Sequence, residues 1–133
     1  KRETLYLKEE TMQTTEFNTF LNRIIEDGIT GCKIDYSDRP DKLKGSVDGF
    51  EACRGKDVGE LTTLLMAAGK ATGDAMMSTP LPKNYWEIRC FEAEIEWVCN
   101  CVSAALLNSG HRPIVPVTAR AVKKVAEVLG VAG

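Results

Sequence analysis

The sequence predicts an all-α fold, and three observations support this class. Apolar residues recur at helical spacing, the connections between the helical segments are short, and residues 84–108 form a long segment without Gly or Pro. That segment holds both Trp and three of the five Cys. We therefore expect a single domain over residues 1–133, a compact bundle of about five helices around a central helix at 84–108.

The predicted central helix has two apolar faces when its residues are placed at about 100° intervals. The first face carries Ile88, Phe91, Ile95, Val98, Cys99, Val102 and Leu106. The second carries Trp86, Cys90, Ala93, Trp97, Cys101 and Ala104. Two apolar faces require neighbours on both sides, so we expect a largely buried helix in which both tryptophans are mostly buried.

Four further helices are predicted from capping residues and apolar stripes, over residues 14–36, 40–54, 58–77 and 119–129. Asp57 and Thr118 are suitable N-caps for the last two helices, and Pro40 suits the first turn of the second. Gly28 and Gly31 cost helix stability. They indicate either a close contact with another helix or a break near Gly28.

Two smaller features complete the predicted architecture. Glycines four residues apart, at 45 and 49 and again at 69 and 73, predict close approach between helices. The extended segment 114–117 has the composition to pair with residues 4–7 as a minimal two-stranded ribbon.

Composition and charge exclude several functional classes. The 133 residues, 44% hydrophobic and 27% charged, are ordinary for a soluble domain with one core. No apolar run approaches the roughly 18 residues needed to cross a bilayer, so no membrane association is expected. The net charge of −2 argues against a dedicated nucleic-acid binder, and no recognition helix follows the last predicted helix.

The cysteines indicate a reducing compartment rather than a disulfide framework. Five is an odd number, and three lie in the predicted central helix. We therefore expect a cytoplasmic protein with reduced cysteines. Cys99 and Cys101 point about 200° apart on a helix and cannot ligate one zinc ion together, so no metal site is favoured.

A polar stripe between the two apolar faces of the central helix is the strongest functional clue. It consists of Arg89, Glu92, Glu96, Asn100 and Ser103. Glu92 and Glu96, four residues apart, either hold a cation or pair with Arg89 and a basic or polar group from another helix, and we expect the second, structural role.

Other residues are candidate site residues in addition to Glu92 and Glu96. Asp74, with Glu92 and Glu96, would complete an acidic set that could hold Mg²⁺ against a phosphorylated substrate. Arg89 and Asn100 are candidate binding residues in the same stripe. His111 and Arg112 could hold an anion near the capping amides at Thr118, but we favour the interpretation that they simply complement the C-terminal end of the central helix.

These patterns predict a small helical protein that acts by association and not by catalysis. The second face of the central helix and the last helix offer more apolar surface than five short helices cover, and a two-fold homodimer is the commonest way to bury it. A different protein partner is also compatible with this surface. The alternative function is a Mg²⁺-dependent hydrolase of a phosphorylated small molecule; the leading function needs no cofactor.

Overall fold

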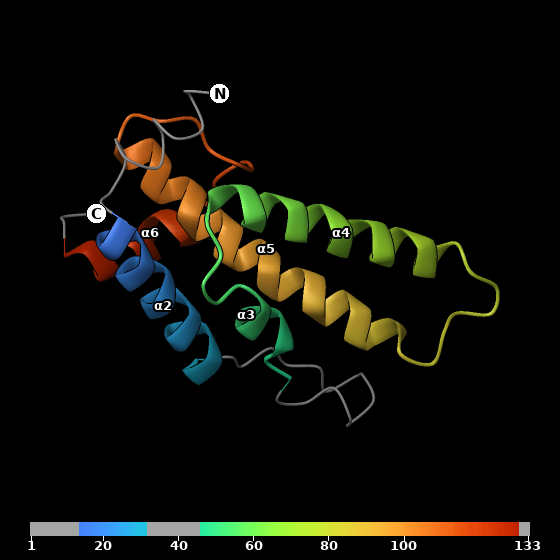
Figure 1. Ribbon diagram of the computed structural model, residues 1–133. Helices are drawn as coiled ribbons and strands as arrows, with labels where there is room; N and C mark the ends of the chain where they lie inside the picture. Colours follow the sequence, from blue (N-terminus) through green and yellow to red (C-terminus); the bar gives the residue numbers. More distant parts are fainter. Residues whose placement is uncertain (1–13, 32–45, 131–133) are drawn as a thin grey trace.

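The central helix expected at residues 84–108 is present as α5, Tyr85–Asn108, and every other described helix packs against it. The computed structural model describes residues 14–31 and 46–130 (Figure 1). In these two segments the remaining helices are α2 (Thr14–Thr30), α3 (Asp48–Ala52), α4 (Val58–Met76) and α6 (Ala119–Leu129). The described residues contain no strand, and the predicted all-α bundle is confirmed.

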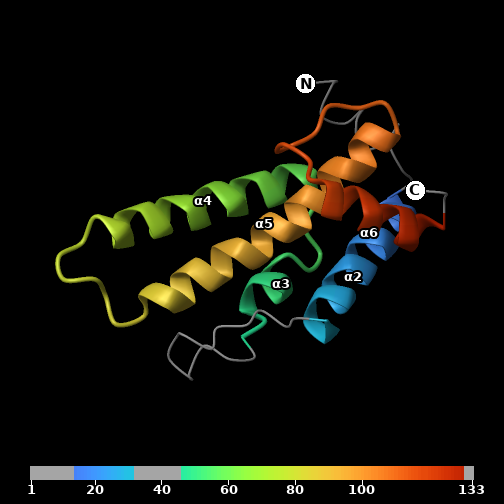
Figure 2. The same ribbon diagram turned by 180° about the vertical axis from the view of Figure 1, so that it is seen from behind.

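The helices α4 and α5 form a long antiparallel hairpin whose tip extends beyond the other helices (Figures 1 and 2). A capping box fixes the start of α4: the Glu60 N–H donates to the Asp57 carboxylate at 2.8 Å, and the Asp57 N–H donates to the Glu60 carboxylate at 2.9 Å. Leu61 and Ala68 are buried against α5. A Cβ on Gly69 would lie 3.2 Å from Glu92 Oε2, whereas Gly73 faces open space, so only Gly69 of this pair makes the predicted close contact.

The helices α2, α3 and α6 pack on the other side of α5. Figure 2 shows α6 and α2 beside the C-terminal half of α5 and α3 beside its middle. The Phe50 ring of α3 lies against Gly28 so closely that a Cβ at Gly28 would overlap the ring. Gly28 therefore admits a close contact and does not break the helix, because α2 continues to Thr30.

Buried side chains from all five described helices form one cluster. Its most deeply buried members include Leu21, Ile24, Leu61 and Ile95, each 0% exposed. The four cysteines of the described segments are free and buried, as expected for reduced core residues. Within residues 14–31 and 46–130, no helix is both long and apolar enough to cross a membrane.

Several boundaries differ from the prediction. The predicted second helix, 40–54, appears as the single turn and a half of α3, and residues 32–45 lie outside the described segments. Of the predicted ribbon, residues 4–7 also lie outside them. The segment 114–117 is not a strand, because the N–H groups of Ile114 and Val115 donate to the buried Ser103 hydroxyl at 2.9 and 3.1 Å.

Both tryptophans of α5 are mostly buried, as the two-face pattern predicts, although neither is fully buried. Ala93, which lies between them on the same face, is exposed. Cys90, Cys101 and Ala104, from the same predicted face, are buried as expected. The second apolar face is therefore covered only in part within one chain.

Candidate functional site

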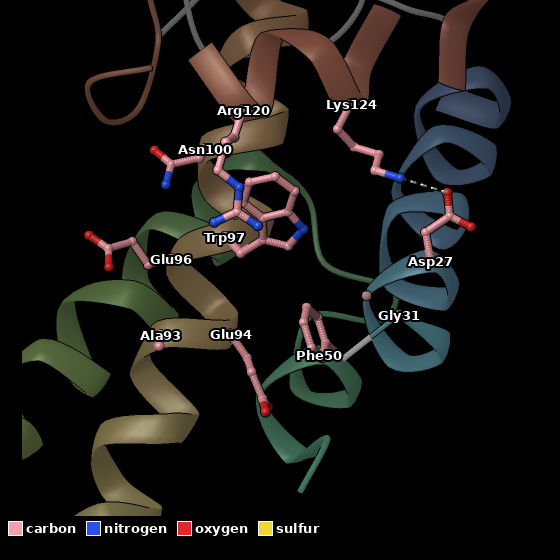
Figure 3. Close-up of a pocket in the computed structure, with 11 residues that line it drawn as sticks. Asp27, Gly31, Phe50, Ala93, Glu94, Glu96, Trp97, Asn100, Arg120 and Lys124 are labelled. Carbon is pink, nitrogen blue, oxygen red and sulfur yellow. Dashed lines mark ion pairs between the residues drawn. The ribbon is translucent and has the colours of Figure 1, made fainter. Parts of the chain in front are cut away.

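A cleft of about 630 Å³ opens between α2, α3, α5 and α6 (Figure 3). It exists because α2 and α6 cover only the C-terminal half of α5 and leave a space beside the middle of that helix. Its walls include Asp27 of α2, Phe50 of α3, Trp97 and Asn100 of α5, and Arg120 and Lys124 of α6. The cleft thus combines aromatic rings with charges of both signs.

One wall is a stacked pair of side chains from two helices. The Arg120 guanidinium lies 5.0 Å from the centre of the Trp97 ring, a cation–π contact. Arg120 lies in the first turn of α6, which Thr118 fixes by accepting the Ala121 N–H with its hydroxyl at 3.2 Å. The contact places an aromatic ring and a cation side by side in the wall of the cleft.

The opposite wall is closed by ion pairs between α2 and α6. The Asp27 carboxylate lies 3.7 Å from Lys124 Nζ, the contact drawn in Figure 3, and 3.1 Å from Arg23 Nε. Lys124 also pairs with Glu127 at 3.3 Å. Pairs this exposed add little stability, but they orient the side chains at the edge of the cleft.

Glu94 is a buried carboxylate that ties α3 to α5. It is 2% exposed, and one oxygen accepts the Gly49 N–H at 2.8 Å. The N-cap of α3, Val47, offers no side-chain acceptor, so Glu94 supplies one from another helix. Burial raises the pKa of Glu94 to about 7, although the N–H groups of Gly49 and Phe50 oppose that rise.

Glu94 was not among the predicted site residues, although the sequence carries a signal for it. Its neighbours at helical spacing, Cys90, Val98 and Cys101, are all apolar. A single carboxylate on an otherwise apolar face marks a buried group that needs a partner. The partner itself, a backbone N–H 45 positions earlier in the chain, has no sequence signature.

The three predicted acidic residues do not meet. Asp74 lies on the exposed side of α4 and pairs with Lys70 at 2.9 Å, while Glu92 lies against α4 at Gly69. Of the three, only Glu96 lines the cleft. The described residues also contain no group of three or more His, Cys, Asp or Glu arranged to hold a metal ion.

Arg89 takes different partners from the glutamates expected in the sequence. Its guanidinium donates to the Tyr85 hydroxyl at 2.9 Å and lies 5.8 Å from the ring centres of both Tyr85 and Trp86. Among the described ion pairs, none joins Arg89 or another basic side chain to Glu92 or Glu96. The expected structural ion pair of these glutamates is therefore not formed within the described part of the chain.

The remaining predicted binding residues divide between two places. Asn100 lines the cleft. His111 and Arg112 lie in the loop after α5, where the His111 N–H donates to the Leu106 carbonyl at 2.8 Å, and neither residue lines the cleft. The Thr118 hydroxyl already occupies the Ala121 N–H that an anion near Thr118 could have used.

A continuous surface runs from the cleft along the first half of α5. It consists of Trp86, Arg89, Ala93, Glu96, Trp97 and Asn100, and we call it the uncovered face of α5. Arg89, Ala93 and Glu96 are exposed, and the other three are partly buried. Four of these residues, Ala93, Glu96, Trp97 and Asn100, line the cleft, and Trp86 and Arg89 extend the surface beyond it toward the start of α5.

Comparison of the chain with protein-family models, with curated proteins and with solved structures found no match. Function must therefore be inferred from the chain's own residues and their geometry.

Proposed function

We propose that this protein acts by association, as a self-associating interaction protein and not as an enzyme. The uncovered face of α5 is the observation that carries the proposal. It places two partly buried tryptophans, an exposed arginine and an exposed alanine on the helix around which the whole domain packs. Trp and Arg are the residues most enriched among those that dominate binding energy at interfaces.

Two other surfaces fit this role less well. Met66, Met76, Met77 and Leu81 are exposed on α4 and the hairpin tip, but they include no aromatic residue. The last helix, α6, turns Ala121 and Val125 into the core and leaves Val122 as an isolated exposed apolar side chain. The uncovered face of α5 is therefore the better candidate for the interface.

The hydrolase alternative has no support from the geometry. It requires carboxylates that converge on one accessible space, whereas Asp74 and Glu92 lie away from the cleft that Glu96 lines. The two tryptophans and the stacked arginine are readily explained by association.

Ala93→Glu tests the proposal at the centre of the uncovered face. Light scattering after size exclusion should give the wild type about twice the chain mass. The variant should give the mass of one chain, because it buries an unpaired charge at the interface without disturbing the core. Ala67→Glu, the same change at an exposed position of α4, is the matched control and should leave the dimer intact.

Circular dichroism should show the same helix content in all three proteins. A wild type that stays monomeric at high micromolar concentration would contradict the proposal. A dimer unaffected by Ala93→Glu would place the interface elsewhere.

A further inference from the structure

We propose that two copies pair through antiparallel α5 helices about a two-fold axis beside Ala93. In this arrangement Arg89 of each copy meets Glu96 of the other, and Trp86 of each copy enters the other's cleft. The inference rests on the proposed function and names the partner, a second copy of the chain, and its register.

The spacing of the uncovered face suits pairing with another helix. At 100° per residue, its six residues fall within an arc of about 100°. Trp86, Ala93 and Asn100 are seven residues apart, and so are Arg89 and Glu96. A seven-residue spacing keeps side chains on the same side of a helix that packs lengthwise against another.

The charges select the antiparallel orientation. An interface between identical copies must be complementary to itself, because every contact occurs twice. Parallel helices would place Arg89 against Arg89 and Glu96 against Glu96, with repulsion at both contacts. Antiparallel helices place Arg89 against Glu96 twice, and both residues are exposed. Within the chain the Arg89 guanidinium donates from one nitrogen to the Tyr85 hydroxyl, and its other N–H groups can donate to Glu96 of the second copy.

The same register explains why the small residue Ala93 lies at the centre of the uncovered face. The midpoint between residues 89 and 96 lies between 92 and 93, so the two-fold axis passes beside Ala93. Ala93 has the smallest side chain of the uncovered face, and a small side chain at the crossing point lets two helices approach closely.

The two ends of the paired α5 segment are also complementary in this register. A register that opposes residues 89 and 96 brings Trp86 of one copy opposite residues 99 and 100 of the other, and Asn100 lines the cleft. Trp97, Phe50 and Arg120 line that cleft, so an entering indole would meet two aromatic rings and a cation. Within one chain Trp86 keeps part of its surface exposed, and its burial in the cleft would complete the interface.

Charge reversal tests the register directly. Sedimentation should be run on the wild type, Arg89→Glu, Glu96→Arg, the double variant, and an equal mixture of the two single variants. Each single variant replaces two attractive contacts by two repulsive ones, so we expect its dimer dissociation constant to rise at least about tenfold. In the double variant and in the mixture every contact is again between opposite charges, and dimerisation should return to near the wild-type level.

Lys70→Glu and Asp74→Lys, which reverse an ion pair on the exposed side of α4, are matched controls and should dimerise as the wild type does. Trp86→Ala should also weaken the dimer at least about tenfold, whereas Leu81→Ala, which truncates an exposed apolar residue nearby, should not. A dimer in which the single charge variants behave as wild type would overturn this register while leaving the proposed function standing. Failure of the mixture to recover would overturn it as well, and a monomeric wild type would overturn both proposals.

Discussion

The Glu94 carboxylate stabilises the fold through a hydrogen bond and destabilises it through its buried charge. Its oxygen satisfies the Gly49 N–H at the start of α3, yet its charge is removed almost completely from water. Burial raises its pKa from 4.5 to about 7, so near neutral pH the charged form is costly. The residue acts as a hydrogen-bond acceptor, and its charge is not needed for that role.

Glu94→Gln separates these two effects. Glu94 binds its proton more tightly in the folded than in the unfolded protein, so its contribution is fully present below about pH 4.5 and is lost as the pH rises through about 7. The glutamine keeps an oxygen acceptor and carries no charge. We therefore expect the variant to be more stable than the wild type at about pH 8, by up to about 3 kcal/mol, with little difference at about pH 4.5.

Urea unfolding of both proteins across this pH range measures the difference. A wild type that is the more stable of the two above neutral pH would show that the Glu94 charge itself holds the fold together.

At the scale of the helix, periodicity predicts where elements lie but not which element covers which face. The bounds of α4 and α6 agree with the prediction to within one residue, because caps at Asp57 and Thr118 and regular apolar stripes mark them. The polar stripe of α5 was less predictable. Ser103 proves to be fully buried, because it accepts the N–H groups of the loop after α5. Arg89 donates to Tyr85, one turn earlier on α5, and not to the glutamates of the stripe.

Substitution of Gly49 tests how closely α3 and α5 approach each other. A Cβ at this position would lie 2.5 Å from the Phe91 carbonyl oxygen and 2.6 Å from Glu94 Cβ, too close without movement of the backbone. We expect Gly49→Ala to lower the free energy of unfolding by about 1–3 kcal/mol, as overpacking does.

Gly73→Ala is the control for Gly49→Ala, because Gly73 also lies within a helix but has nothing within 4 Å. There the alanine should raise stability by about 0.5–1 kcal/mol. Equal effects of the two substitutions in urea unfolding would mean that α3 and α5 are not in close contact.

At the scale of the whole molecule, the reactivity of the buried cysteine thiols shows whether the core stays closed to solvent. Cys90, Cys53, Cys99 and Cys101 are buried, and burial raises the pKa of the last three to about 12. Since the thiolate is the reactive form, these groups should be inert to thiol reagents in the native protein.

A Cys32→Ser variant restricts the measurement to those four thiols. We expect no reaction with a disulfide reagent in native buffer, and reaction of all four across the urea unfolding transition. A thiol that reacts rapidly before unfolding would reveal an opening of the core that the structure does not contain.

The residues of the candidate site could be predicted only in part from the sequence, because the cleft depends on how the helices pack together. Asn100 and Glu96 were found because polar residues at helical spacing stand out between apolar faces. Phe50, Asp27 and Arg120 were not, because the cleft forms only where α2, α3 and α6 come together around α5. The incomplete covering of the second apolar face was expected, because five short helices offer too little surface to cover it, but α5 alone does not show which of its residues stay exposed.

The Glu94 carboxylate of α5, which caps the start of α3, also sets the order in which these two helices form. A helix of five residues cannot nucleate by itself, and its acceptor lies 45 positions further along the chain. During synthesis α2 and the residues of α3 emerge before that acceptor exists, so α3 must wait for α5. The Phe50 wall of the cleft therefore forms only once α5 is in place, and local opening of α3 would remove that wall while the α4–α5 hairpin stays folded.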